Sequence, residues 1–183
     1  MGKFAVIDTE TNWADQVMSI GTVIGDEDTF QPMDAKYHIL PAECEMGGMY
    51  LDALFLDTPV KPILCTREEA IQDLLCWFRH SGIRSVFAYN ACFDRTRLPE
   101  FQCLDWFDIM RLAAYRQHNP RIPASADCFR TGRMRRNYGV EPMLRLLSGN
   151  RTYFETHNAL LDALDELQIM RLLGKNINQY IPL

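Results

Sequence analysis

The feature that most constrains the fold is a change of hydrophobic spacing along the chain, from short strand-like runs to helical repeats. Lys3–Asp8 is an apolar run closed by an acid, which is typical of a buried strand. Val17–Ile24 and Ala35–Leu40 have strand-like composition and are bounded by turn residues, and Arg84–Tyr89 is a fourth strand candidate. Strands followed by helices predict an α/β fold with a mixed sheet.

The first predicted helix begins at a capping box, Thr66-Arg67-Glu68-Glu69, and ends near Gly82. Further helices are predicted over Asn90–Leu98, Asp108–Gln117, Val140–Leu147 and Ala159–Leu173. Residues 41–65 and 118–137 contain proline and glycine without a clear period, so we interpret them as connections. A length of 183 residues with 48% hydrophobic residues predicts one domain.

No apolar stretch of the sequence has the length of a membrane span. The apolar run Phe4–Ile7 is also too short for the core of a signal peptide. The six cysteines never lie two or three positions apart, so no zinc-ligand pair is present. We therefore expect a cytoplasmic protein with reduced thiols and no membrane partner.

The charge of the chain is unevenly distributed. Residues 84–151 contain twelve arginines, no lysines and six acidic residues, a local charge of +6 within a chain of net charge −5. The densest cluster is Arg130, Arg133, Arg135 and Arg136. Arginine suits phosphate contacts and stacking on bases, although a solvated loop explains the cluster equally well.

Three separated segments carry acids that suit metal chemistry. Asp8 and Glu10 are two residues apart at a strand end, so both side chains point to one face, where two anions repel unless a cation lies between them. In the second segment Asn90 comes at the start of a helix, and Asp94 follows one turn later. Asn90 either caps this helix or binds a sugar or phosphate.

The third segment contains His157 and Asp162. Five residues of regular helix leave two side chains roughly 140° apart, so these two meet only if His157 precedes the helix or lies in its first turn. Thr156 and Asn158 are both plausible N-cap residues, which permits that arrangement. Asp165 and Glu166 compete as ligands, but we expect both to be solvated.

The order of these motifs resembles the DEDDh family of 3′–5′ exonucleases, which includes proofreading exonuclease subunits, ribonuclease T and oligoribonuclease. The matching segments are Asp8-Thr9-Glu10-Thr11, Asn90-Ala91-Cys92-Phe93-Asp94, Phe107–Ala113 and His157-Asn158-Ala159-Leu160-Leu161-Asp162-Ala163. Two positions differ from many relatives: Asn12-Trp13 follows the first motif, and Tyr89 precedes Asn90. Both bear on substrate preference.

The resemblance implies a ribonuclease-H-like fold with about five central strands and a single exonuclease domain over residues 1–183. It further implies two Mg²⁺ or Mn²⁺ ions held by the acids Asp8, Glu10, Asp94 and Asp162, with His157 as the general base. Such an enzyme releases nucleoside 5′-monophosphates from the 3′ ends of single-stranded DNA or RNA.

Five residues are predicted to contact the terminal nucleotide: Thr9, Thr11, Asn90, Tyr89 and Trp13. Trp13 or Tyr89 would stack on its base, although either is equally an ordinary core or surface aromatic. The resemblance leaves open a homodimer, and a polymerase or another nucleic-acid enzyme, as further partners.

Three other functions compete with this prediction. One is a catalytically silent nucleic-acid-binding module on the same fold, and another is a protein-interaction module whose acids are only surface charge. The third is an endonuclease of the wider ribonuclease-H-like superfamily. The His157 motif is the feature that distinguishes the predicted exonuclease from such an endonuclease. The full set of acids and the histidine favour the exonuclease.

Overall fold

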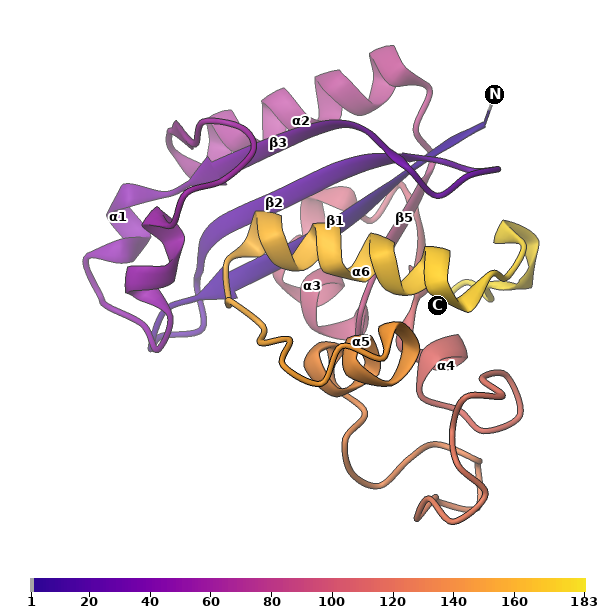
Figure 1. Ribbon diagram of the computed structural model, residues 1–183. Helices are drawn as coiled ribbons and strands as arrows, with labels where there is room; N and C mark the ends of the chain where they lie inside the picture. Colours follow the sequence, from indigo (N-terminus) through magenta and orange to yellow (C-terminus); the bar gives the residue numbers. More distant parts are fainter. Residues whose placement is uncertain (1) are drawn as a thin grey trace.

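The computed structural model describes residues 2–183, which form a mixed six-stranded sheet with helices on both faces (Figure 1). The strands are β1 (Lys3–Thr11), β2 (Val17–Asp26), β3 (Pro32–Ile39), β4 (Ile63–Leu64), β5 (Ser85–Ala88) and β6 (Asp105–Asp108). They lie in the order β4-β3-β2-β1-β5-β6. Strands β1 to β3 are antiparallel, whereas β5 is parallel to β1, and β6 to β5. The predicted α/β class with a mixed sheet is confirmed.

Two long helices begin and end where local signals predict. The helices are α1 (Pro41–Cys44), α2 (Arg67–Ser81), α3 (Cys92–Arg97), α4 (Met110–Ala113), α5 (Val140–Ser148) and α6 (Ala159–Leu173), with 3₁₀-helices at Leu51–Phe55, Pro99–Phe101 and Ile177–Gln179. Helix α2 has the predicted capping box between Thr66 and Glu69, and Gly82 ends it with φ of 73°. Helix α6 begins after Asn158 and ends at Gly174.

The alternation of side chains along β1 divides the interior into two cores. Phe4 and Val6 pack with α5 and α6, whereas Ala5 and Ile7 pack on the opposite face with α2. In Figure 1, α6 crosses one face of the sheet and α2 lies along the other. Since side chains alternate with period two, Asp8 continues the row that faces α6.

The sequence-based prediction is wrong for Asp108–Gln117, which contains only the four-residue helix α4. Asp108 instead ends strand β6, and its Oδ1 accepts hydrogen bonds from the backbone N–H groups of Asn90 and Met110 (3.0 Å each). The helix ends at Ala114, whose carbonyl accepts from the backbone N–H of Met134 in the following connection (3.0 Å) instead of from a later turn of helix. Strand β6 was missed because its four residues alternate too briefly to identify.

Residues 118–137 contain no helix or strand, as predicted, and extend beyond the sheet and its helices (Figure 1). Two isolated bridges, Tyr115 with Arg133 and Cys128 with Met134, shape this connection. Across residues 2–183 no helix combines the length and apolar character that a membrane crossing needs.

Candidate active site

The beginning of α6 lies directly on β2 because position 21 has no side chain. Gly21 pairs with Asp8 across the β1–β2 ladder. A Cβ atom built on Gly21 would lie 2.1 Å from the backbone of Ala159 and 2.3 Å from the backbone nitrogen of Leu160. This close approach brings Asp162, in the first turn of α6, over the end of β1.

Asn158 holds His157 outside the helix. Its Oδ1 accepts from the backbone N–H groups of Leu160 (3.2 Å) and Leu161 (3.3 Å), which makes it the N-cap residue. Its Nδ2 donates to the carbonyl of Ala53 (2.8 Å) and to the Tyr37 hydroxyl. His157 therefore precedes the helix, with φ of 54°, which is the condition for it to meet Asp162.

Glu10, His157 and Asp162 form the centre of the site. Each offers one potential ligand atom, and these atoms all lie within 4.8 Å of one another. Asp8 lines the same open cavity of about 400 Å³. The other lining residues include Thr9, Thr11, Trp13, Met49, Tyr50, Phe93 and Glu155. Three of the four predicted acids and the predicted base thus share one cavity.

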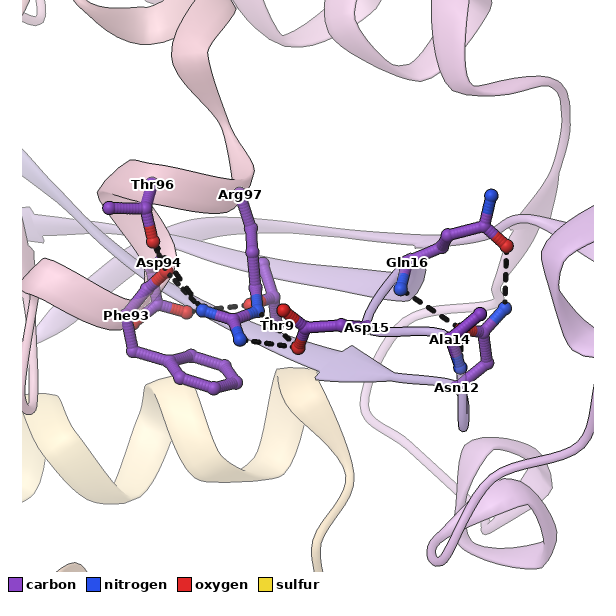
Figure 2. Close-up of polar contacts among 9 residues, drawn as sticks. All are labelled: Thr9, Asn12, Ala14, Asp15, Gln16, Phe93, Asp94, Thr96 and Arg97. Carbon is purple, nitrogen blue, oxygen red and sulfur yellow. Dashed lines mark hydrogen bonds and ion pairs between the residues drawn. The ribbon is translucent and has the colours of Figure 1, made fainter.

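Asp94 lies behind this cavity rather than in its wall. The Thr9 hydroxyl donates to Asp94 Oδ1 (2.7 Å), and the aspartate is buried in α3 (Figure 2). Burial raises the pKa of Asp94, which the Thr9 hydrogen bond and the nearby Arg97 oppose. Its neighbour Phe93 lines the cavity, and the Arg97 guanidinium lies 3.5 Å from the centre of that ring.

Arg97 also links α3 to the turn after β1. Its Nε donates to Asp15 Oδ1 (3.0 Å), and one terminal nitrogen donates to the carbonyl of Phe93 (3.1 Å; Figure 2). The turn itself is organised by Asn12, whose Oδ1 accepts from the backbone of Ala14 and Gln16. Trp13 in this turn is 66% exposed at the edge of the cavity.

The acids repel one another in the absence of a cation. Burial, followed by the charges of Glu155 and Asp94, raises the pKa of Glu10 to about 8. Burial also raises the pKa values of Asp8 and Asp162, with the other carboxylates adding to both shifts. Asp8 Oδ2 and Asp162 Oδ1 are buried without a hydrogen-bond partner in the described residues. Oxygen ligands left unpaired around one cavity fit a hard divalent cation.

His157 is chemically suited to accept a proton. Burial lowers its pKa, and the charge of Glu141 opposes that shift. A lowered pKa favours the neutral imidazole, which is the form that accepts a proton. Tyr50 stacks on the imidazole, with the ring centres 3.8 Å apart and an angle of 16° between the planes. The sequence offered no signal for Tyr50, because it lies in the connection over residues 41–65.

Two further carboxylates belong to this region. The prediction that Glu166 is solvated is wrong: its side chain is 1% exposed, and its charge is the largest carboxylate effect raising the pKa of Asp8. Asp165 is half-buried, and its carboxylate accepts from the Tyr153 hydroxyl. Helix α6 packs between the sheet and α5. Residues outside its apolar stripe, which the sequence pattern predicts to be exposed, are therefore partly covered as well. The i, i+4 spacing of Asp162 and Glu166 was the available signal.

The predicted substrate residues fall into two groups. Thr9, Thr11 and Trp13 line the main cavity, whereas Tyr89 and Asn90 line an adjoining cavity of about 330 Å³. Tyr89 is buried and its hydroxyl donates to the carbonyl of Tyr138. Asn90 does not cap α3: it has φ of 63°, and Ala91 occupies the N-cap position.

Comparison with known proteins finds similarity in structure alone. No protein-family model matches the sequence, and none of the curated proteins matches it significantly. A crystal structure of a full-length 3′-exonuclease superimposes with a TM-score of 0.64 at 14% identity, covering 99% of this chain and 90% of that one. The nuclease domain of 3′hExo, a DEDDh family member bound to rAMP, gives a TM-score of 0.66 at 13% identity, covering 99% and 96%.

Exonuclease I from E. coli, in complex with a dT13 oligonucleotide, gives a TM-score of 0.61 at 11% identity. That match covers 98% of this chain but 42% of the Exonuclease I chain. All three superpositions cover nearly the whole of this chain. The chain therefore has the α/β, ribonuclease-H-like fold of the DEDDh 3′–5′ exonucleases.

Proposed function

We propose that this protein is a metal-dependent 3′–5′ exonuclease that releases nucleoside 5′-monophosphates from single-stranded DNA or RNA. The observation that carries the proposal is the meeting of Glu10, His157 and Asp162 within 4.8 Å, beside Asp8 in an open cavity. A catalytically silent binding module does not require buried acids with unpaired oxygens, which are costly to keep.

Two Mg²⁺ or Mn²⁺ ions would be held by Asp8, Glu10 and Asp162, with Asp94 contributing from behind the cavity wall. Such ions activate water and stabilise the charge that develops on a phosphate and its departing oxygen. Thr9 keeps Asp94 oriented through its hydrogen bond of 2.7 Å. A bound cation would offset the repulsion between the acids and so favour the ionised form of each carboxyl group.

His157 would act as the general base. A ring nitrogen of His157 takes a proton from the attacking water. The water oxygen bonds to the phosphorus of the terminal nucleotide, while the bond between that phosphorus and the 3′ oxygen of the preceding nucleotide breaks. That 3′ oxygen leaves with a proton from solvent, so the products are a nucleoside 5′-monophosphate and a strand shorter by one residue. Stacking on Tyr50 keeps the imidazole facing Glu10 and Asp162.

The terminal nucleotide would bind along the cavity wall formed by Thr11, Trp13 and Phe93. The exposed indole of Trp13 would stack on the base, a contact that accepts any base. Asn90 would contact the strand from the adjoining cavity. One structural neighbour is in complex with rAMP and another with dT13, so we propose tests on both RNA and DNA oligonucleotides.

The arginine cluster at residues 130–136 would bind the rest of the strand. Arg133 reaches the adjoining cavity, and its guanidinium lies 5.0 Å from the Phe129 ring and 5.2 Å from the Tyr138 ring. Arg130 and Arg136 are exposed. Positive charge with partly exposed aromatic rings is the combination that binds single strands. The homodimer, the polymerase partner and the cytoplasmic location stay predictions.

The test is a time course of digestion of 5′-labelled DNA and RNA oligonucleotides with Mg²⁺ or Mn²⁺, followed by EDTA. We expect a ladder that shortens from the 3′ end and stops when EDTA is added. Asp162→Asn should abolish the ladder, whereas Asp165→Asn, three residues along the same helix, should retain it. An Asp162→Asn protein as active as the wild type would refute the proposal, as would internal cleavage without a ladder.

A further inference from the structure

Glu166 is a buried acid that the four-carboxylate pattern of the motifs does not include. It lies on α6 one turn after Asp162, and its side chain is 1% exposed. Its Oε2 has no hydrogen-bond partner within residues 2–183, and none of the ion pairs there involves it. A carboxylate oxygen removed from water without a donor or a cation is strongly unfavourable.

The side chain that carries this unpartnered oxygen lines a defined space. Glu166 lines the adjoining cavity of about 330 Å³ together with Asp8, Asn90 and Glu155. Asp8 and Glu155 also line the main cavity, which contains Glu10, His157 and Asp162. Asp8 thus stands between two cavities, with one group of potential ligands on each side. Its buried Oδ2 is also unpartnered in the described chain.

We propose that Glu166 is a fifth metal ligand, which with Asp8 holds a divalent cation at the adjoining cavity. This proposal rests on the metal centre of the proposed function and adds a residue to it. The cavity is open, so waters complete the coordination of a hard ion that prefers oxygen ligands. Glu10 and Asp162 are left to hold a separate ion on the other side of Asp8, with His157 beside it as the base.

A purely structural role for Glu166 makes a different prediction. If the side chain were simply a neutral buried acid, glutamine would replace it with little change, because it has nearly the same shape and no charge. If the carboxylate binds a cation, Glu166→Gln removes a ligand and weakens metal binding even in the absence of substrate. Binding of Mn²⁺ therefore separates the two roles without reference to catalysis.

The experiment is a calorimetric titration of Mn²⁺ into the metal-stripped protein, with thermal unfolding recorded at each metal concentration. We expect Glu166→Gln to weaken one Mn²⁺ site by about tenfold or more and to reduce the rise in melting temperature that Mn²⁺ produces. Asp165→Asn is the matched control, since it removes a neighbouring charge that pairs with Tyr153, and should bind Mn²⁺ like the wild type.

Glu166→Met, which removes both polar atoms, is the second variant in case the buried amide prevents folding; it should lose the same site. Unchanged Mn²⁺ binding by a folded variant, alongside clear binding by the wild type, would overturn the role of Glu166 alone. A wild type that binds no Mn²⁺ would overturn the metal centre itself and the proposed function with it.

Discussion

A Cβ atom on Gly21 would lie 2.1 Å from the backbone of Ala159, so the first turn of α6 touches the backbone of β2. This contact places Asp162 over the strand pair that carries Asp8, because Gly21 is the partner of Asp8 in the ladder. The position of the third acidic motif therefore depends on the absence of one methyl group.

Gly21→Ala should displace α6 and destabilise the protein by about 1–3 kcal/mol, the usual cost of overpacking. The obstruction is backbone rather than a flexible side chain, so it cannot move away cheaply. Chemical denaturation measures the change in the free energy of unfolding. Gly139→Ala is the control, because its new methyl meets nothing closer than 3.9 Å. Equal, small effects of both substitutions would contradict the close approach.

The metal-free protein should become less stable as the pH rises from about 5 to above 8. The folded protein holds a proton on Glu10 up to a pKa of about 8, whereas the unfolded chain releases it near 4.5. Between these values the folded state binds more protons, so the free energy of unfolding falls with increasing pH. Melting curves in EDTA across this range test the trend.

Mn²⁺ should oppose that loss, because a bound cation favours the ionised acids and stabilises the folded state by mass action. The rise in melting temperature with millimolar Mn²⁺ is expected to be larger at pH 8 than at pH 5.5. A metal effect that is the same at both values would argue against ionisation of the buried acids on binding.

His157→Ala should lower the rate of hydrolysis by roughly 10²–10⁴-fold, the usual contribution of a general base. Initial rates on a 5′-labelled oligonucleotide give the comparison, and the acidic limb of the pH–rate curve should disappear in the variant. Calorimetry should show that Mn²⁺ still binds through the carboxylates. A pH–rate curve of unchanged shape would remove His157 from the role of base.

Tyr50→Leu should reduce kcat by roughly two- to tenfold, since a stacked aromatic pair contributes about 0.5–1.5 kcal/mol. The loss follows from an imidazole that is no longer held against a flat ring 3.8 Å away. Tyr50→Phe keeps the ring and should behave like the wild type. A change confined to KM would instead assign Tyr50 to substrate binding.

Replacing Arg130 and Arg136 by alanine should weaken binding of single-stranded oligonucleotides and flatten its salt dependence, by about 0.7 in the log–log slope for each lost phosphate contact. Fluorescence anisotropy from 50 to 200 mM salt measures both quantities. Arg84→Ala is the control, because this exposed arginine precedes β5 at the end opposite Asn90. An unchanged slope in the double variant would exclude the cluster from the strand path.

Much of the site could be predicted from short-range patterns. Two-residue alternation at a strand end placed Asp8 and Glu10 on one face, and the N-cap preference of Asn158 left His157 outside α6. The capping box at Thr66 is equally local, since its partners are three residues apart. These features depend on backbone geometry that a few neighbouring residues determine.

Other features depend on contacts between distant segments, which no local pattern encodes. Glu166 is buried where α6 lies beside Asp8 and Asn90, which come from other parts of the chain. Tyr50 meets His157 because the connection after β3 folds back beside α6. Thr9 binds Asp94 across 85 residues of sequence.

The sequence by itself determined the α/β class and the main helix ends, because periodicity and capping act over one or two turns. It also proposed the acids and the histidine, through the order of motifs that resembles the exonuclease family. Only the tertiary structure decided which acids share a cavity, which lie behind it and which additional carboxylate is buried next to Asp8. Burial and electrostatic repulsion are set by the layers that close over a side chain, and those layers come from residues far along the chain.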